Sequence, residues 1–219
     1  MFIFYTMKTS DTKLQVSDLK DEQRFRLITS VEHENVVPFV FRYIWKKNKV
    51  TYLYFGANII FLAYLLQIIT TQMIPGSWNM GTTLWQLFLG FILYPILLVP
   101  VHEGIHGLVY LLEGAAKIKF GADLKQYIFY VTADNFVLGK NSFYKLAFTP
   151  FIILSLALTA ASIYIQQPYS WGFSLCLLAH GTMCIGDFAL ASLFAEYPEK
   201  EIYTYDQASE KTSFFYEKI

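Results

Sequence analysis

Long apolar runs joined by polar links are the main pattern of this chain. Four of the runs contain about 20 residues or more, which is the length of helix that crosses a bilayer. They predict transmembrane helices at about residues 51–70, 84–112, 144–165 and 171–195. The expected fold is therefore an all-α membrane protein, built as a four-helix bundle.

The composition agrees with this prediction. Of the 219 residues, 55% are hydrophobic and only 16% are charged, whereas an ordinary soluble domain has about 25% charged residues. The formal net charge is zero, so there is no basic field that would favour nucleic acid. The two cysteines, Cys176 and Cys184, lie eight residues apart in one apolar run and form neither a disulfide framework nor a CxxC motif. We expect the lipid bilayer, and no nucleic acid, as a partner.

The positive charges predict the orientation. Lysines and arginines are concentrated before the first run, around the link between the second and third runs, and in the tail, whereas links 71–83 and 166–170 contain none. The positive-inside rule then places both termini in the cytoplasm. We expect a multi-pass protein of the plasma (inner) membrane, with a cytoplasmic region 1–50, a membrane domain 51–195 and a cytoplasmic tail 196–219. Both polar ends are expected to be solvated.

The middle loop, between the second and third helices, has the pattern of short strands. Residues 117–120 alternate between polar and apolar, residues 127–131 are aromatic and β-branched, and a turn signal follows at Asp134 and Asn135. These segments predict a small cytoplasmic β-hairpin. Its edge could bind an extended peptide by strand addition, or the hairpin could simply cap the bundle.

Residues 102–106 read His-Glu-Gly-Ile-His and lie inside the second apolar run. On a helix, His102 and His106 project from one face, one turn apart, so both imidazoles can reach one ion. Glu103 flanks that face, where it can reach a metal-bound water rather than the metal. Zinc lowers the pKa of such a water to about 7, and a carboxylate beside it can act as the base. The motif predicts a Zn²⁺ site with Glu103 as catalytic residue; a histidine pair without metal is the alternative.

A catalytic zinc ion usually has three protein ligands, so a third must come from elsewhere. Leu112 and Val109 stand where a metzincin would have histidine and glycine, and Glu113 lies about 10 Å along the helix from His106. Asp187, in the fourth apolar run, lies about 14 Å from the cytoplasmic boundary by helical rise. The motif histidines lie at a similar depth, so Asp187 is a candidate ligand. The alternative is a carboxyl group paired with another polar side chain.

Together these features resemble the "putative zincin peptidase" family of membrane proteins, which is similar to the site-2 proteases. The resemblance covers residues 84–195 and is carried by the His-Glu-Gly-Ile-His motif, the strand-like loop, Thr149-Pro150-Phe151 and Gly186-Asp187. It implies zinc held by His102, His106 and Asp187, with Glu103 as the base.

The chain departs from the site-2 pattern in one respect. An Asn-Pro pair commonly precedes the Asp-Gly there, whereas Cys184, Ile185 and Gly186 precede Asp187 here. The asparagine that would stabilise the transition state is therefore unassigned, with Asn135 and Asn141 as candidates. His180 lies seven residues before Asp187 on nearly the same helix face, where it could contact the substrate backbone or complete a polar network. The alternative is an ordinary histidine of the helix bundle whose hydrogen bonds are satisfied.

The expected function is that of a membrane-embedded zinc metalloendopeptidase of the HExxH type, acting on membrane-associated proteins or peptides. One alternative is a non-proteolytic metal-binding scaffold or regulator, in which Cys184 or another group closes a four-ligand shell. Another is a transporter with His180, Asp187 and the His-Glu-Gly-Ile-His motif on an ion path and no tightly bound zinc, but the chain shows no internal pseudo-repeat.

Overall fold

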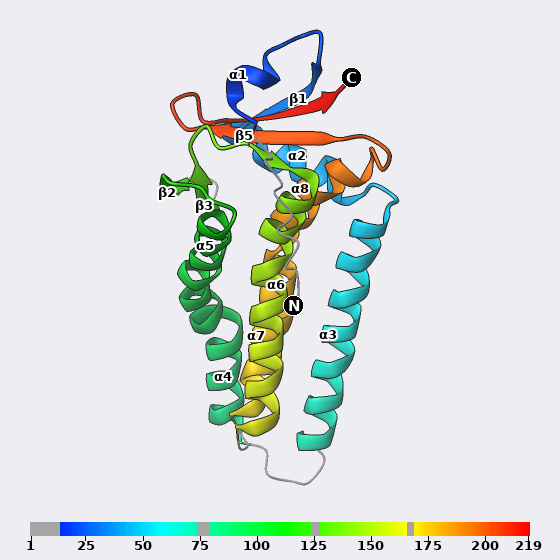
Figure 1. Ribbon diagram of the computed structural model, residues 1–219. Helices are drawn as coiled ribbons and strands as arrows, with labels where there is room; N and C mark the ends of the chain where they lie inside the picture. Colours follow the sequence, from blue (N-terminus) through cyan, green and yellow to red (C-terminus); the bar gives the residue numbers. More distant parts are fainter. Residues whose placement is uncertain (1–13, 74–78, 124–127, 166–168) are drawn as a thin grey trace, which may run out of the picture.

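Long helices that run side by side make up most of the molecule (Figure 1). The computed structural model describes residues 14–73, 79–123, 128–165 and 169–219. Within these ranges, three helical segments are long and apolar enough to cross a membrane. They are α3 (Lys49–Met73), the continuous run of α4 (Met80–Phe88), the π-helical η2 (Leu89–Leu93) and α5 (Tyr94–Leu112), and α6 (Lys140–Tyr164). The predicted first, second and third helices are thus confirmed as apolar candidate spans.

The fourth predicted helix is interrupted. It consists of α7 (Ser170–Met183) and α8 (Ile185–Ala195), which are bent by 42° at Cys184. If the pair is one span, the described residues contain four. Parts of both predicted uncharged links, residues 74–78 and 166–168, lie outside the described residues. The break matters for function because it starts a new helix just before Asp187.

The expectation of a purely α-helical protein was wrong, because the described residues contain six strands in two antiparallel sheets. The predicted hairpin is confirmed as β2 (Ile118–Asp123) paired with β3 (Ile128–Ala133). A second sheet has the order β1-β6-β5-β4, with β1 (Phe25–Glu32), β6 (Thr212–Lys218), β5 (Ile202–Gln207) and β4 (Leu138–Gly139). The short helical elements α1 (Val16–Leu19), η1 (His33–Asn35) and α2 (Val36–Ile44) accompany β1.

This four-stranded sheet lies across one end of the helices (Figure 1). Both polar ends of the chain, expected to be solvated, instead pair with each other through β1 and β6. Phe215 of β6 and Phe194 of α8 are each almost fully buried, and their ring centroids lie 5.8 Å apart. Burial of large aromatic side chains is a main source of packing energy. The sheet is therefore packed onto α8, the helix that carries Asp187.

The second span lies very close to α7. A Cβ atom at Gly90 of η2 would lie 2.5 Å from the Leu175 Cβ atom and 2.7 Å from the Gly172 carbonyl oxygen. Only glycine allows this approach, as is common where membrane helices pack tightly. The contact holds α7, which carries His180, against the span that carries the histidine motif.

Candidate metal centre

Two helices supply the residues of the motif and its predicted partner. Glu103 and the two motif histidines lie in α5, and Asp187 lies in the first turn of α8. The break at Cys184 therefore places the Asp187 carboxylate at a helix N-terminus, where free backbone N–H groups favour negative charge. A straight fourth helix would have left Asp187 in mid-helix.

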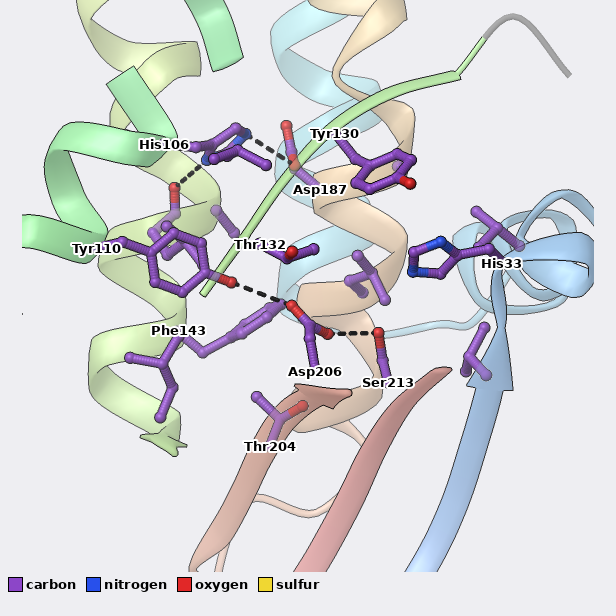
Figure 2. Close-up of a pocket in the computed structure, with 18 of the residues that line it drawn as sticks. His33, His106, Tyr110, Tyr130, Thr132, Phe143, Asp187, Thr204, Asp206 and Ser213 are labelled. Carbon is purple, nitrogen blue, oxygen red and sulfur yellow. Dashed lines mark hydrogen bonds and ion pairs between the residues drawn. The ribbon is translucent and has the colours of Figure 1, made fainter. Parts of the chain in front are cut away.

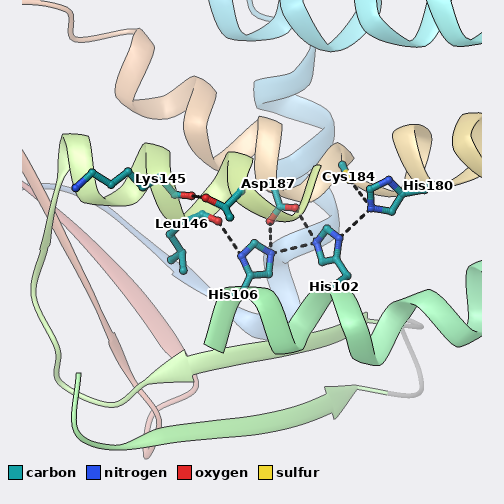
Figure 3. A network of polar contacts seen from close by, with 8 residues as sticks. His102, His106, Lys145, Leu146, His180, Cys184 and Asp187 are labelled. Carbon is teal, nitrogen blue, oxygen red and sulfur yellow. Dashed lines mark hydrogen bonds and ion pairs between the residues drawn. The ribbon is translucent and has the colours of Figure 1, made fainter. Parts of the chain in front are cut away.

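The structure brings His102, His106 and Asp187 together (Figure 3). The Nε2 atoms of the two histidines are 3.1 Å apart, the His102 Nε2 atom lies 3.1 Å from Asp187 Oδ2, and the His106 Nε2 atom lies 3.3 Å from Asp187 Oδ1. Tetrahedral zinc with bonds of about 2.0–2.1 Å separates its ligand atoms by about 3.3 Å. The donor set and its spacing fit a zinc ion.

The second nitrogen of each histidine has its own partner. The Nδ1–H of His106 donates to the backbone carbonyl of Leu146 at 2.9 Å. This hydrogen bond fixes the tautomer in which the lone pair is on Nε2, the atom that faces His102 and Asp187. The Nδ1 atom of His102 lies 3.2 Å from His180 Nε2, so His180 belongs to the polar network around the motif. Cys184 Sγ lies 3.6 Å from the same His180 nitrogen.

Glu103 lies beside this group and next to the hairpin. Its carboxylate lies close to the backbone N–H of Val131 in β3, and both residues line the same cavity. Val131 lies opposite Phe120 of β2, and an N–H that faces Glu103 instead of β2 points to the other edge of β3. The predicted hairpin is thus in contact with the motif helix and is not a distant cap.

Two cavities meet at Glu103, Gly186 and Asp187. One, of about 360 Å³, extends along the helices past His102 and His180, and we call it the helix cavity. Its other walls are mostly apolar and include Phe41, Pro95, Leu98, Val99 and Met183. The second, of about 210 Å³, extends under the four-stranded sheet to His33, Asp206 and Ser213, and we call it the sheet cavity (Figure 2).

Gly186 lines both cavities at the place where they meet. Apart from its chain neighbours and the backbone of its own helix, a Cβ atom at Gly186 would have no atom within 4 Å, so this glycine does not mark a close contact between helices. The missing side chain leaves room where the two cavities join.

The two candidate asparagines do not line either cavity. Asn135 is exposed in the turn after β3, with a left-handed φ of 55°, and its side chain donates to Asp134 Oδ1 at 3.3 Å. Asn141 is exposed at the start of α6. Sequence reasoning placed them as substitutes for the missing asparagine, but the walls around Glu103 are formed by other residues.

Sequence reasoning missed the polar end of the sheet cavity. His33, expected to be solvated, packs its ring against Tyr130 with centroids 4.7 Å apart, and burial lowers its pKa. Asp206, from the predicted solvated tail, accepts from Ser213 Oγ at 2.6 Å and from Tyr110 Oη at 3.4 Å. Burial raises the pKa of Asp206 above its usual value. The local signal was the alternation of aromatic and polar residues in 203–206, typical of a strand.

Comparison with known proteins relates part of the chain to a described family. No match is found among curated proteins or solved structures. A family model described as "Putative zincin peptidase" matches residues 95–202, which include the motif helix, the hairpin, α6 and α8. The match suggests metallopeptidase activity and implies zinc, in agreement with the donor set described above. It supports a zincin-like family for this chain.

Proposed function

We propose that the protein is a membrane-embedded zinc metallopeptidase that hydrolyses peptide bonds of membrane-associated substrates. The observation that carries the proposal is the convergence of His102, His106 and Asp187, with ligand atoms 3.1–3.3 Å apart, beside the Glu103 carboxylate. Three protein ligands are typical of a catalytic zinc site, because the fourth position stays open. Among the residues that the structure describes, this donor group has three members.

Each residue has a definite part in this proposal. Zinc bound to the three ligands would act as a Lewis acid that polarises the substrate carbonyl and makes water a stronger nucleophile. Glu103 accepts the proton of the attacking water and returns it to the leaving nitrogen. The Val131 N–H keeps the Glu103 carboxylate in position. Leu146 and His180 orient the imidazole rings of His106 and His102 through their outer nitrogens.

The cavities and the hairpin favour a peptide as substrate. The outer edge of β3 passes Glu103, and in a strand the backbone groups of alternate residues, here Phe129, Val131 and Ala133, point to the same side. An extended peptide can pair with such an edge, which presents its amide bonds in a regular row. The helix cavity is apolar and the sheet cavity has a polar end, so a substrate that leaves the bilayer could lie across both.

The location follows from the charges of the sequence. The positive-inside rule puts the sheet end of the molecule and both termini in the cytoplasm. In this orientation the site lies in the bilayer near its cytoplasmic face, in the plasma (inner) membrane.

A non-proteolytic metal-binding scaffold is the second candidate, because a second possible donor group that includes Cys184 lies beside the first. Cys184 forms a separate donor group with His180 and the other nitrogen of His102. It does not join the group of His106 and Asp187. The donor set with Asp187 therefore keeps an open position, which favours catalysis over a closed structural site.

The test is cleavage by the purified full chain in detergent, with Glu103→Gln as the matched variant. Glutamine keeps the shape of the side chain but cannot take up the proton, so zinc content should stay near the wild-type value while cleavage of an apolar test peptide falls by at least about a hundredfold. Turnover that persists in Glu103→Gln would refute the assigned mechanism. Wild-type protein that binds zinc but cleaves no membrane peptide would favour the scaffold.

A further inference from the structure

The sheet cavity contains a second acidic group, at the end opposite to the candidate metal centre. Asp206 of β5 lines the cavity together with Tyr110, Ser213 and His33 (Figure 2). The hydroxyls of Ser213 and Tyr110 each donate one hydrogen bond to its carboxylate. A carboxylate can accept about four hydrogen bonds, so part of its capacity is unused by these two donors.

Among the residues that line the cavity near Asp206, the basic side chain is that of His33, whose pKa is lowered by burial. No lysine or arginine is among the described residues that line the sheet cavity, and none of the ion pairs among them includes Asp206. Much of the wall is apolar, with Leu138, Phe143 and Phe215 among its residues. Burial in these surroundings disfavours the ionised carboxylate and raises its pKa. A cation that enters the cavity would remove this cost and form a charge-assisted hydrogen bond.

The length of α5 between Glu103 and Tyr110 indicates how far Asp206 lies from the proposed site of cleavage. Tyr110, which donates to Asp206, lies seven residues after Glu103 on α5, or about 10 Å of helical rise. An extended peptide rises about 3.3 Å per residue, so this distance corresponds to about three residues of substrate.

We propose that Asp206 is a specificity-determining residue that binds a lysine or arginine side chain of the substrate, about three residues from the bond that is cleaved. The inference rests on the proposed peptidase function and adds the substrate class. Membrane-spanning segments carry lysine and arginine at their cytoplasmic ends. In the proposed orientation, such a flank would enter the sheet cavity while the apolar part of the segment lies in the helix cavity.

The test measures binding, so that it does not depend on turnover. The probe is a series of fluorescent ten-residue peptides of leucine and alanine, with one lysine moved along the peptide and norleucine as the uncharged control. They are titrated into the full chain carrying Glu103→Gln in detergent micelles. When the lysine stands at one particular position of the peptide, or at two neighbouring positions, we expect that peptide to bind at least about tenfold more tightly than its norleucine counterpart.

Asp206→Asn should reduce that preference to less than about twofold, since asparagine keeps the shape of the side chain and can accept from one hydroxyl through its oxygen and donate to the other through its NH2 group, but has no charge. The matched control is Asp134→Asn, which changes a nearby surface carboxylate paired with Lys119 and should keep the preference. If the lysine and norleucine peptides bind the protein with equal affinity at every position, the proposal is overturned by this measurement alone. A preference that survives Asp206→Asn would overturn it as well.

Cleavage of the same peptides by the wild-type protein separates this inference from the proposed function. A lysine preference without cleavage would keep the cation site and reject the peptidase. Cleavage without a lysine preference would keep the peptidase and reject the role of Asp206.

Discussion

The His106 side chain donates its Nδ1–H to the carbonyl of Leu146 at 2.9 Å, and Pro150 explains why this carbonyl is available. In a helix, the carbonyl of residue 146 accepts from the N–H of residue 150, and proline has no N–H. Pro150 lies inside α6, so the Leu146 carbonyl lacks its helical donor. A proline in one apolar helix thus provides the acceptor that orients a histidine in another.

Pro150→Ala is therefore expected to weaken zinc binding. The new N–H would compete with His106 for the Leu146 carbonyl, and partners of this kind change metal affinity by about tenfold or more. Alanine is a better helix former than proline, so the loss should occur in a protein that is no less stable. Competition of the purified protein with a zinc chelator measures the affinity. Thr149→Ala, one residue earlier, is the control, and an equal effect in both variants would argue against the role of Pro150.

His180 is expected to act as a positioning residue for His102. Its Nε2 atom lies 3.2 Å from His102 Nδ1, and its side chain is 2% exposed. His180→Leu removes the acceptor and should lower zinc affinity about 10- to 100-fold. His180→Gln can still accept the hydrogen bond and should restore most of the affinity. If leucine and glutamine have the same effect, His180 contributes only packing.

The four-stranded sheet should lose stability in acid through Glu217. Hydrogen bonds from Lys200 and Arg26 hold the pKa of this buried carboxyl below its usual value of 4.5. A carboxyl whose pKa is lowered by folding stabilises the protein fully above about pH 4.5, and this contribution is lost as the pH falls through the lower, folded-state pKa. The melting temperature of the wild type should therefore fall below about pH 4.5.

Glu217→Gln should lower the melting temperature at pH 7 and flatten its fall in acid. The exposed Glu22→Gln serves as control and should behave like the wild type. An acid profile of Glu217→Gln that is parallel to that of the wild type would contradict the role of the ion pairs.

The sequence was sufficient for the features that depend on local composition and spacing. Apolar runs identified the candidate spans, the spacing of His102 and His106 identified a metal motif, and helical rise brought Asp187 to the same depth. These inferences need only hydropathy and the regular geometry of one helix at a time. The hairpin was also visible, because β2 and β3 are close in the sequence and rich in aromatic and β-branched residues.

Features that depend on distant contacts could not be read in this way. Strand β1 pairs with β6 at the other end of the chain, and no local pattern specifies that partner. The break at Cys184 follows no proline or charged residue, and the role of Asp206 depends on a sheet whose strands come from both ends. The acceptor for His106 required both the position of Pro150 and the packing of α5 against α6.

The zinc content of the Asp187→Ala variant tests the central claim most directly. Purified wild-type protein should contain about one zinc ion per chain, and Glu103→Gln should match it, because Glu103 is the base and not a ligand. Asp187→Ala removes one of three ligands and should bind zinc at least about a hundredfold more weakly in chelator competition. Zinc content and affinity that are unchanged in Asp187→Ala would contradict the proposed centre of His102, His106 and Asp187.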